Sequence, residues 1–101
     1  MIQYSSNVEL LETLDLNGFF VGWPSQPSSE NFTKILKSSY KVVIAFEEGK
    51  LIGFINSISD GILCSYIPLL EVLPDYQKQG IGKELIKRML EEMQRMVLTT
   101  S

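Results

Sequence analysis

Histidine is absent from this 101-residue sequence, and cysteine occurs once, at Cys64. Structural zinc sites are built from sets of cysteine and histidine ligands, so this composition excludes one. A disulfide within the chain needs two thiols and is impossible. Because a cysteine nucleophile needs a base to activate it, we favour a buried structural thiol for Cys64 over a catalytic one.

The sequence also lacks long apolar runs and any excess of positive charge. No stretch approaches the roughly 20 apolar residues that a membrane-spanning helix needs. The segment from Met1 to Tyr4 is neither basic nor continuously apolar, as a signal peptide would be. The net charge of -3 and an isoelectric point of about 4.9 argue against a nucleic-acid partner. We therefore expect a cytoplasmic protein with neither a membrane nor a nucleic acid as its partner.

The sequence does contain the pattern of one small α+β domain spanning residues 1–101. The N-terminal part predicts a strand at 2–5, a helix at 7–17 capped by Asn7 and ended by Gly18, and a second helix from Ser28 or Ser29 to Ser38. Residues 18–28 hold two glycines and two prolines and are expected to be irregular.

Three β-rich runs follow, at 42–46, 51–59 and 62–73. The turns between them are short, and Asp60-Gly61 is a strong hairpin signal, so the runs predict an antiparallel meander. Pro68 cannot donate a ladder hydrogen bond, and we expect the third strand to bulge or to leave its neighbour there. An amphipathic helix at 83–96 comes last, and its predicted apolar face comprises Leu85, Ile86, Met89, Leu90, Met93 and Met96.

The segment between the third strand and the last helix carries the chemistry. It reads Gln77-Lys78-Gln79-Gly80-Ile81-Gly82-Lys83. A glycine-containing turn that opens a helix suits an anion, because the first N–H groups of a helix are unpaired and glycine allows close approach. Lys78 and Lys83 add positive charge. The interpretation is a phosphate or pyrophosphate site, and the alternative is a strand-to-helix connection without a ligand.

Two familiar glycine motifs do not fit this segment. A dinucleotide-binding fingerprint needs glycine where Leu85 stands, and a Walker A loop needs glycine at Gln77 and a hydroxyl residue at Glu84. The match is to the pyrophosphate motif Gln/Arg-x-x-Gly-x-Gly/Ala. With the strand before it and the amphipathic helix after it, the segment resembles the GNAT superfamily of N-acetyltransferases, in particular its small bacterial members.

The resemblance implies a three-layer GNAT-like fold and an acetyl-CoA-dependent N-acetyltransferase that acts on a primary amine, with no metal. In that family the N–H groups of the turn, here Gln79 to Lys83, bind the pyrophosphate of CoA. The end of the preceding strand, here Glu71 to Leu73, pairs with the pantetheine arm through main-chain hydrogen bonds. The cofactor-binding positions implied are Val72, Leu73, Gln77, Lys78, Gln79, Gly80, Ile81, Gly82 and Lys83.

Other roles are less directly implied. Transfer needs a neutral amine, so a base would be useful, and Glu71 is the carboxylate of the 62–73 strand. The alternative for Glu71 is a solvated strand residue. Phe20 and Trp23 stand where the family's substrate loop lies, and they either line the acceptor site or pack in the core. The family's frequent tyrosine general acid comes from a later segment, and we transfer that role to no residue here.

The sequence looks C-terminally shortened beside the family, whose complete domain continues with a further strand. The 62–73 strand is then expected to have an open edge, which favours a homodimer. A rival hypothesis is a catalytically silent CoA-binding or assembly module, which would keep the same motif. The acceptor, a small-molecule or peptide amine, stays open.

Overall fold

The computed structural model describes residues 1–59 and 65–100 of the chain. Its centre is a four-stranded antiparallel sheet with the strand order β1-β2-β3-β4. The strands are β1 (Gln3–Ser5), β2 (Lys41–Glu47), β3 (Lys50–Ser59) and β4 (Ser65–Val72). The predicted α+β class and the meander are confirmed. The expected Asp60-Gly61 hairpin, the start of the third predicted run and Cys64 lie outside the described residues.

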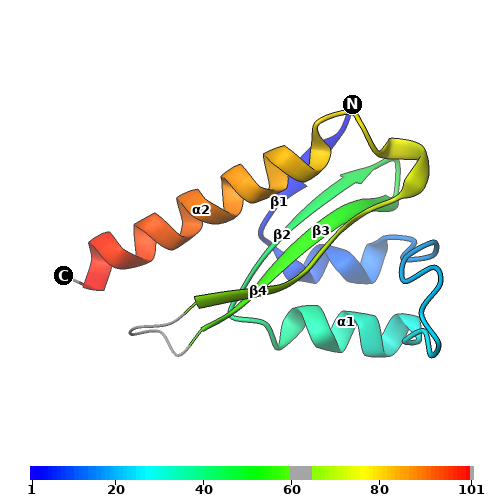
Figure 1. The fold of residues 1–101 in the computed structure, drawn as a ribbon, viewed down its shortest axis with the longest axis horizontal. Helices are drawn as coiled ribbons and strands as arrows, with labels where there is room; N and C mark the ends of the chain where they lie inside the picture. The colour runs from blue at the N-terminus through cyan, green and yellow to red at the C-terminus, as the bar shows by residue number, and fades with distance from the viewer. Residues whose placement is uncertain (60–64, 101) are drawn as a thin grey trace.

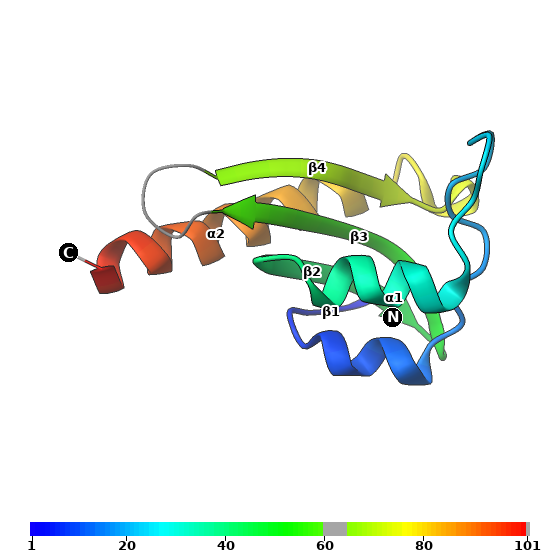
Figure 2. The same cartoon turned by 90° about the horizontal axis from the view of Figure 1, so that it is seen from below.

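Helices cover both faces of the sheet and produce three layers (Figure 1). The long helix α2 (Ile81–Thr100) lies on one face, and the 3₁₀ helix η1 (Val8–Thr13) and α1 (Ser29–Lys37) lie on the other. Figure 2 shows β4 at one edge of the sheet and β1 at the other. Within the part of the chain that the structure describes, no helix is long and apolar enough to cross a membrane.

An aromatic cluster fills the space between the sheet and α1. At its centre, Phe54 of β3 has no exposed surface, and its ring centroid lies 5.0 Å from that of Phe32 on α1. Phe19 and Phe20, from the loop before α1, lie 5.5 Å and 6.1 Å from the same ring. Rings at these distances with tilted or edge-to-face geometry attract one another beyond simple area burial. The cluster therefore holds the loop, α1 and the sheet together.

The first predicted helix is shorter than expected and is not α-helical. Asn7 caps it as predicted, its side chain accepting a hydrogen bond from the N–H of Glu9. The helix ends at Thr13 rather than at Gly18, because the chain then runs along the sheet edge. There Asp15 donates its N–H to Gly49 O at 2.8 Å and accepts from Leu51 N at 2.9 Å.

The other helices follow the sequence more closely. Ser28 caps α1 as predicted and accepts a hydrogen bond from the N–H of Asn31. The helix α2 begins at Ile81, before the predicted start at 83, and Ile81, Leu85 and Met89 are buried at the i, i+4 spacing. The predicted apolar face was wrong in part: Ile86 and Leu90 are 40% and 50% exposed. Each follows a buried residue by one position, so they lie beside the buried row and contribute little to the core.

The irregularity expected at Pro68 is confirmed. Asn56 pairs with Leu69 and Ile58 with Tyr66, so the register of β4 against β3 shifts by one residue between these pairs. Ile67 and Pro68 therefore stand opposite Ser57 alone, the arrangement of a β-bulge. In the sheet that the structure describes, β4 is an edge strand whose neighbour is β3.

Candidate nucleotide and acceptor site

The turn between β4 and α2 has an unusual backbone. After β4 the chain makes a short 3₁₀ helix, η2 (Pro74–Tyr76), and then adopts left-handed conformations at Lys78, with φ of 68°, and at Gly80, with φ of 81°. Such a conformation costs a residue with a side chain about 1–2 kcal/mol, so strain at Lys78 needs compensation. Turns that alternate in this way point main-chain N–H groups into a shared concavity that suits anions.

The N-terminus of α2 opens into the same turn. The first hydrogen bond of the helix runs from Glu84 N to Gly80 O at 3.0 Å, which leaves the N–H groups of Ile81, Gly82 and Lys83 without a helical acceptor. No side chain among residues 1–59 and 65–100 is found to cap them. A Cβ built on Gly80, the residue just before these donors, would meet nothing within 4 Å.

The end of β4 lies directly beside this helix terminus. A Cβ added to Gly82 would lie 3.8 Å from Cγ2 of Val72, so the first turn of α2 packs on the last residue of the strand. Leu73 donates its N–H to Ile52 O of β3 at 2.9 Å. Main-chain groups of an antiparallel strand alternate in direction, so those of Val72 point away from β3, toward the open edge.

The remaining motif residues frame this corner. The side-chain Nε2 of Gln77 donates to Val72 O at 3.1 Å. This bond stabilises the carbonyl of Val72, one of its two main-chain groups that point toward the open edge. Lys78, Gln79 and Lys83 are exposed, Lys78 in the turn itself and Lys83 in the first turn of α2. The structure thus brings Val72, Gln77 and the turn together. Leu73 is buried and turns its main-chain N–H toward β3 instead of the edge.

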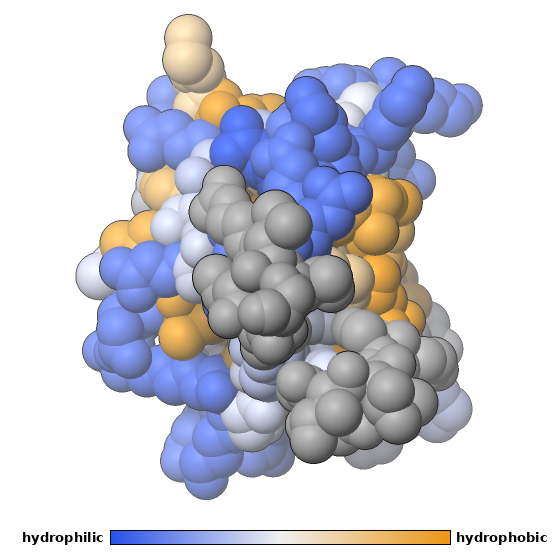
Figure 3. Space-filling view, turned by 90° about the vertical axis from the view of Figure 1, so that its left-hand side faces the viewer, coloured by the Kyte–Doolittle hydropathy of each residue, from blue (hydrophilic) through white to orange (hydrophobic). Residues whose placement is uncertain are grey.

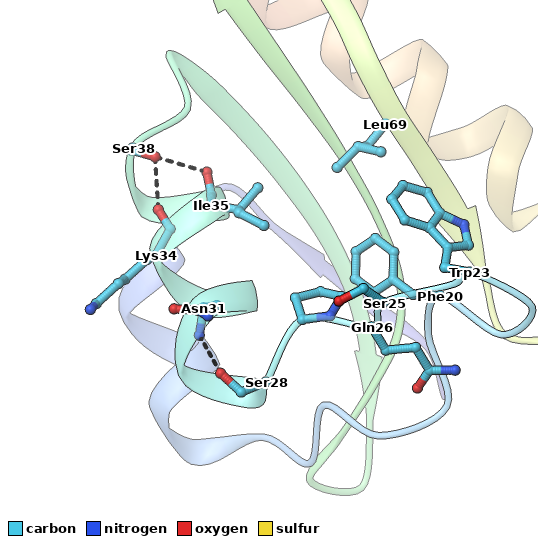
Figure 4. A pocket seen from close by; sticks show the side chains of 11 residues that line it. Phe20, Trp23, Ser25, Gln26, Ser28, Asn31, Lys34, Ile35, Ser38 and Leu69 are labelled. Atoms are coloured by element: carbon cyan, nitrogen blue, oxygen red, sulfur yellow. Dashed lines mark hydrogen bonds between the residues drawn. The ribbon is translucent and has the colours of Figure 1, made fainter.

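A groove of about 620 Å³ lies on the other side of β4, between that strand, the loop after Gly18 and α1. Figure 4 shows Phe20, Trp23 and Leu69 facing Ile35 across it, while Lys34 points away. The Phe20 ring is also buried in the aromatic cluster, and its centroid lies 4.9 Å from that of Trp23, which is 49% exposed. Phe20 therefore both packs in the core and lines the groove, whereas Trp23 packs on Phe20 and lines the groove from a half-exposed position.

The other residues of the groove gave no signal in the sequence. They include Leu69 of β4, Asn31 and Ile35 of α1 and Ser38 at the end of that helix, and only the packing of α1 against the sheet brings them together. Their residue types are ordinary for a strand and a helix. No local pattern could have marked them as lining a shared surface.

Glu71 lies on the face of β4 that bears this groove, opposite Phe54 in the strand pairing. Its Oε1 accepts a hydrogen bond from the main-chain N–H of Phe20 at 3.2 Å. Its Oε2 is buried and has no hydrogen-bond partner among the described residues. The alternative of a solvated strand residue is therefore wrong, because the carboxylate is turned into the protein and bonded to the loop.

Comparison with known proteins agrees with this geometry. The profile of the Acetyltransferase (GNAT) family matches residues 8–100. The chain belongs to this family. Among curated proteins, the histone acetyltransferase TAP1 of Glycine max is 33% identical over 84 residues, which cover 72% of this chain and 36% of that protein.

Solved structures of GNAT-like proteins superpose well on the chain. A putative acetyltransferase from Deinococcus radiodurans has a TM-score of 0.82 and 41% identity, covering 90% of this chain and 64% of its own. A probable acetyltransferase of meticillin-resistant Staphylococcus aureus has a TM-score of 0.76 and 21% identity, covering 95% and 71%. The likeness at 21% identity shows the fold alone. The chain spans less than two thirds of the soybean and Deinococcus proteins.

Proposed function

We propose that the chain is an acetyl-CoA-dependent N-acetyltransferase that acylates a primary amine. One observation carries the proposal: the unpaired N–H groups at the start of α2 lie beside the outward main-chain groups of Val72. The first feature suits a pyrophosphate and the second suits an extended amide-containing arm. Family membership supports the same cosubstrate. A cytoplasmic location remains a prediction of the sequence.

The donor set fits the cosubstrate in number and in kind. The N–H groups of Ile81, Gly82 and Lys83 would hold the pyrophosphate, and the absent side chain of Gly80 leaves room for it. Lys78 and Lys83 add positive charge at the rim. Val72 would hold the arm, with Gln77 fixing the orientation of the strand end. Bound acetyl-CoA supplies an activated acetyl thioester, while these residues bind and orient it.

The groove on the opposite side of β4 is the acceptor side of the proposal. Phe20 and Trp23 offer an aromatic wall that excludes water, and Asn31 and Ser28 line the polar end. An amine entering there would approach β4 from the face opposite α2. The described lining contains no carboxylate, so the groove gives no particular support for a polycationic acceptor, and the acceptor class stays open between small-molecule and peptide amines.

Calorimetric titration of the chain with acetyl-CoA tests the cosubstrate site first. We expect binding in the micromolar range, followed by release of free CoA thiol when a panel of primary amines is added. The matched ligand is desulfo-CoA, which keeps the pyrophosphate and the arm and should bind without any transfer. A folded chain that binds neither ligand would contradict the proposal.

A second candidate function is a CoA-binding or assembly module without transfer. It is favoured by the edge position of β4, whose Ile67 and Leu70 are 37% and 39% exposed. Ile86 and Leu90 of α2 are exposed as well, and Figure 3 shows patches of hydrophobic surface on both sides of the view. Edge strands with exposed apolar side chains readily pair with another chain. We propose a second copy of this chain as the occupant, which would make a homodimer.

Sedimentation velocity with and without acetyl-CoA distinguishes the two uses of this edge. Since the outward groups of Val72 cannot serve a second copy and the pantetheine arm together, we expect acetyl-CoA to shift a dimer toward the monomer. Ile67→Lys should weaken the dimer without lowering the affinity for acetyl-CoA, because a charged edge residue opposes strand pairing. A monomer at all concentrations would refute the homodimer, and a dimer indifferent to acetyl-CoA would place the interface elsewhere.

A further inference from the structure

The two oxygens of Glu71 have very different surroundings. Oε1 accepts the hydrogen bond from Phe20 N, across 51 residues of sequence. Oε2 has almost no contact with solvent and no partner among the described residues. A general base needs an oxygen that can reach the amine or a water on the way to it. Neither oxygen is presented in that way, because one is occupied by the loop and the other is enclosed.

The N–H that Glu71 accepts belongs to a strained residue. Phe20 has a φ of 61°, a left-handed conformation that residues with a side chain rarely adopt, and it lies between Gly18 and Gly22 with φ of 99° and 87°. Trp23 then donates its N–H to Phe20 O at 3.1 Å and closes the turn. Strain of this kind persists only where surrounding contacts hold it in place. A buried carboxylate on the N–H of the strained residue is such a contact.

A second contact ties the same loop to the end of β4. A Cβ added to Gly18 would come within 2.9 Å of Cδ2 of Leu73, so the loop backbone lies directly on that side chain. Glu71 of β4 and Leu73, directly after the strand, thus hold the loop at alternate positions, while the main-chain groups of Val72 between them point to the open edge. The strand end therefore positions the loop on one side and offers its main chain on the other.

We propose that Glu71 is a positioning residue, whose carboxylate anchors the loop at Phe20 and so fixes the aromatic wall of the acceptor groove against β4. The ring of Phe20 and the indole of Trp23 follow the main chain that Glu71 holds. In Figure 4 these two rings form one side of the groove. The role of the groove in acetyl transfer rests on the proposed function, but the anchoring of the loop does not.

The anchoring of the loop can be tested by the fluorescence of Trp23, without any ligand. Trp23 is the only tryptophan of the chain, so its fluorescence reports this loop alone. Glu71→Gln keeps an oxygen that can accept from Phe20 N and removes the charge, whereas Glu71→Ala removes both. We expect the alanine variant to raise acrylamide quenching of Trp23 and to lower its anisotropy, and the glutamine variant to stay close to the wild type. Glu91→Ala, on the exposed face of α2, is the control and should leave Trp23 unchanged.

Steady-state kinetics with an amine that the chain acetylates then separates a positioning role of Glu71 from proton transfer. We expect Glu71→Ala to raise KM for the amine about tenfold, the factor for one lost hydrogen bond. Glu71→Gln should keep kcat near that of the wild type. A glutamine variant with normal Trp23 quenching and a collapsed kcat would overturn the proposal in favour of a general base.

Unchanged Trp23 quenching in Glu71→Ala would overturn the proposal equally. If the alanine variant does not fold, Glu71→Gln still decides between the two roles by its kcat, because it keeps an oxygen that can accept from Phe20 N and removes the charge that a general base needs. Failure of the chain to bind acetyl-CoA would refute the proposed function and leave the fluorescence result standing.

Discussion

Replacing Gly80 with glutamate should lower the affinity for acetyl-CoA by at least about 100-fold, equivalent to about 2.7 kcal/mol. The new carboxylate would extend from the residue just before the N–H groups of Ile81, Gly82 and Lys83, where an added Cβ meets nothing within 4 Å. There it would occupy the place of the pyrophosphate and repel it. The fold should survive, because a carboxylate at a helix N-terminus favours the helix dipole. Calorimetric titration of the variant with acetyl-CoA measures the loss.

Gly49→Glu is the matched control for this substitution. Gly49 has a φ of 78°, close to the 81° of Gly80, and a Cβ there would also meet nothing within 4 Å. It lies in the turn between β2 and β3, so the control adds the same charge and about the same backbone strain away from the site. Gly80→Ala isolates the strain itself. Equal losses in Gly80→Glu and Gly49→Glu would mean that global destabilisation, not the pyrophosphate site, explains the effect.

The glycine turn could be predicted from the sequence because its chemistry is local. A helix that begins directly after Gly80 must leave its first N–H groups unpaired, whatever the rest of the chain does. The motif also determines which residues form the turn just before those N–H groups. Likewise, the bulge at Pro68 follows from a missing donor in a strand. Both features depend on residues that are neighbours in the chain.

The groove between β4, α1 and the loop after Gly18 could not be predicted in the same way, because it depends on tertiary contacts. The bond from Phe20 N to Glu71 joins residues 51 positions apart, and no local pattern distinguishes a carboxylate that serves a loop from one that serves a substrate. The end of η1 was missed for the same reason, since Asp15, two residues after the helix ends, bonds with Gly49 and Leu51. Helical periodicity placed Ile86 in the core, whereas the packing of α2 leaves it at the surface.

Truncating Phe54 to alanine should destabilise the fold by about 3–5 kcal/mol, a large part of the roughly 5–15 kcal/mol that a domain of this kind has in total. Phe54 has no exposed surface, and its ring contacts those of Phe19, Phe20 and Phe32, so the cavity would open among three separate elements. Urea unfolding followed by circular dichroism measures the change. Phe54→Leu, which keeps more of the volume, should cost about 1–1.5 kcal/mol and serves if the alanine variant does not fold.

Ile58→Ala on the same strand is the control, because Ile58 is 55% exposed and its loss should change stability by less than about 1 kcal/mol. The effect of Phe54→Leu should also reach the groove. The ring of Phe20 packs on that of Phe54, and the indole of Trp23 packs on Phe20. We therefore expect Trp23 to become more accessible to acrylamide in Phe54→Leu, with the affinity for acetyl-CoA nearly unchanged. Loss of stability without any change at Trp23 would contradict the view that this cluster supports the loop of Phe20 and Trp23, and would leave Glu71 as its main anchor.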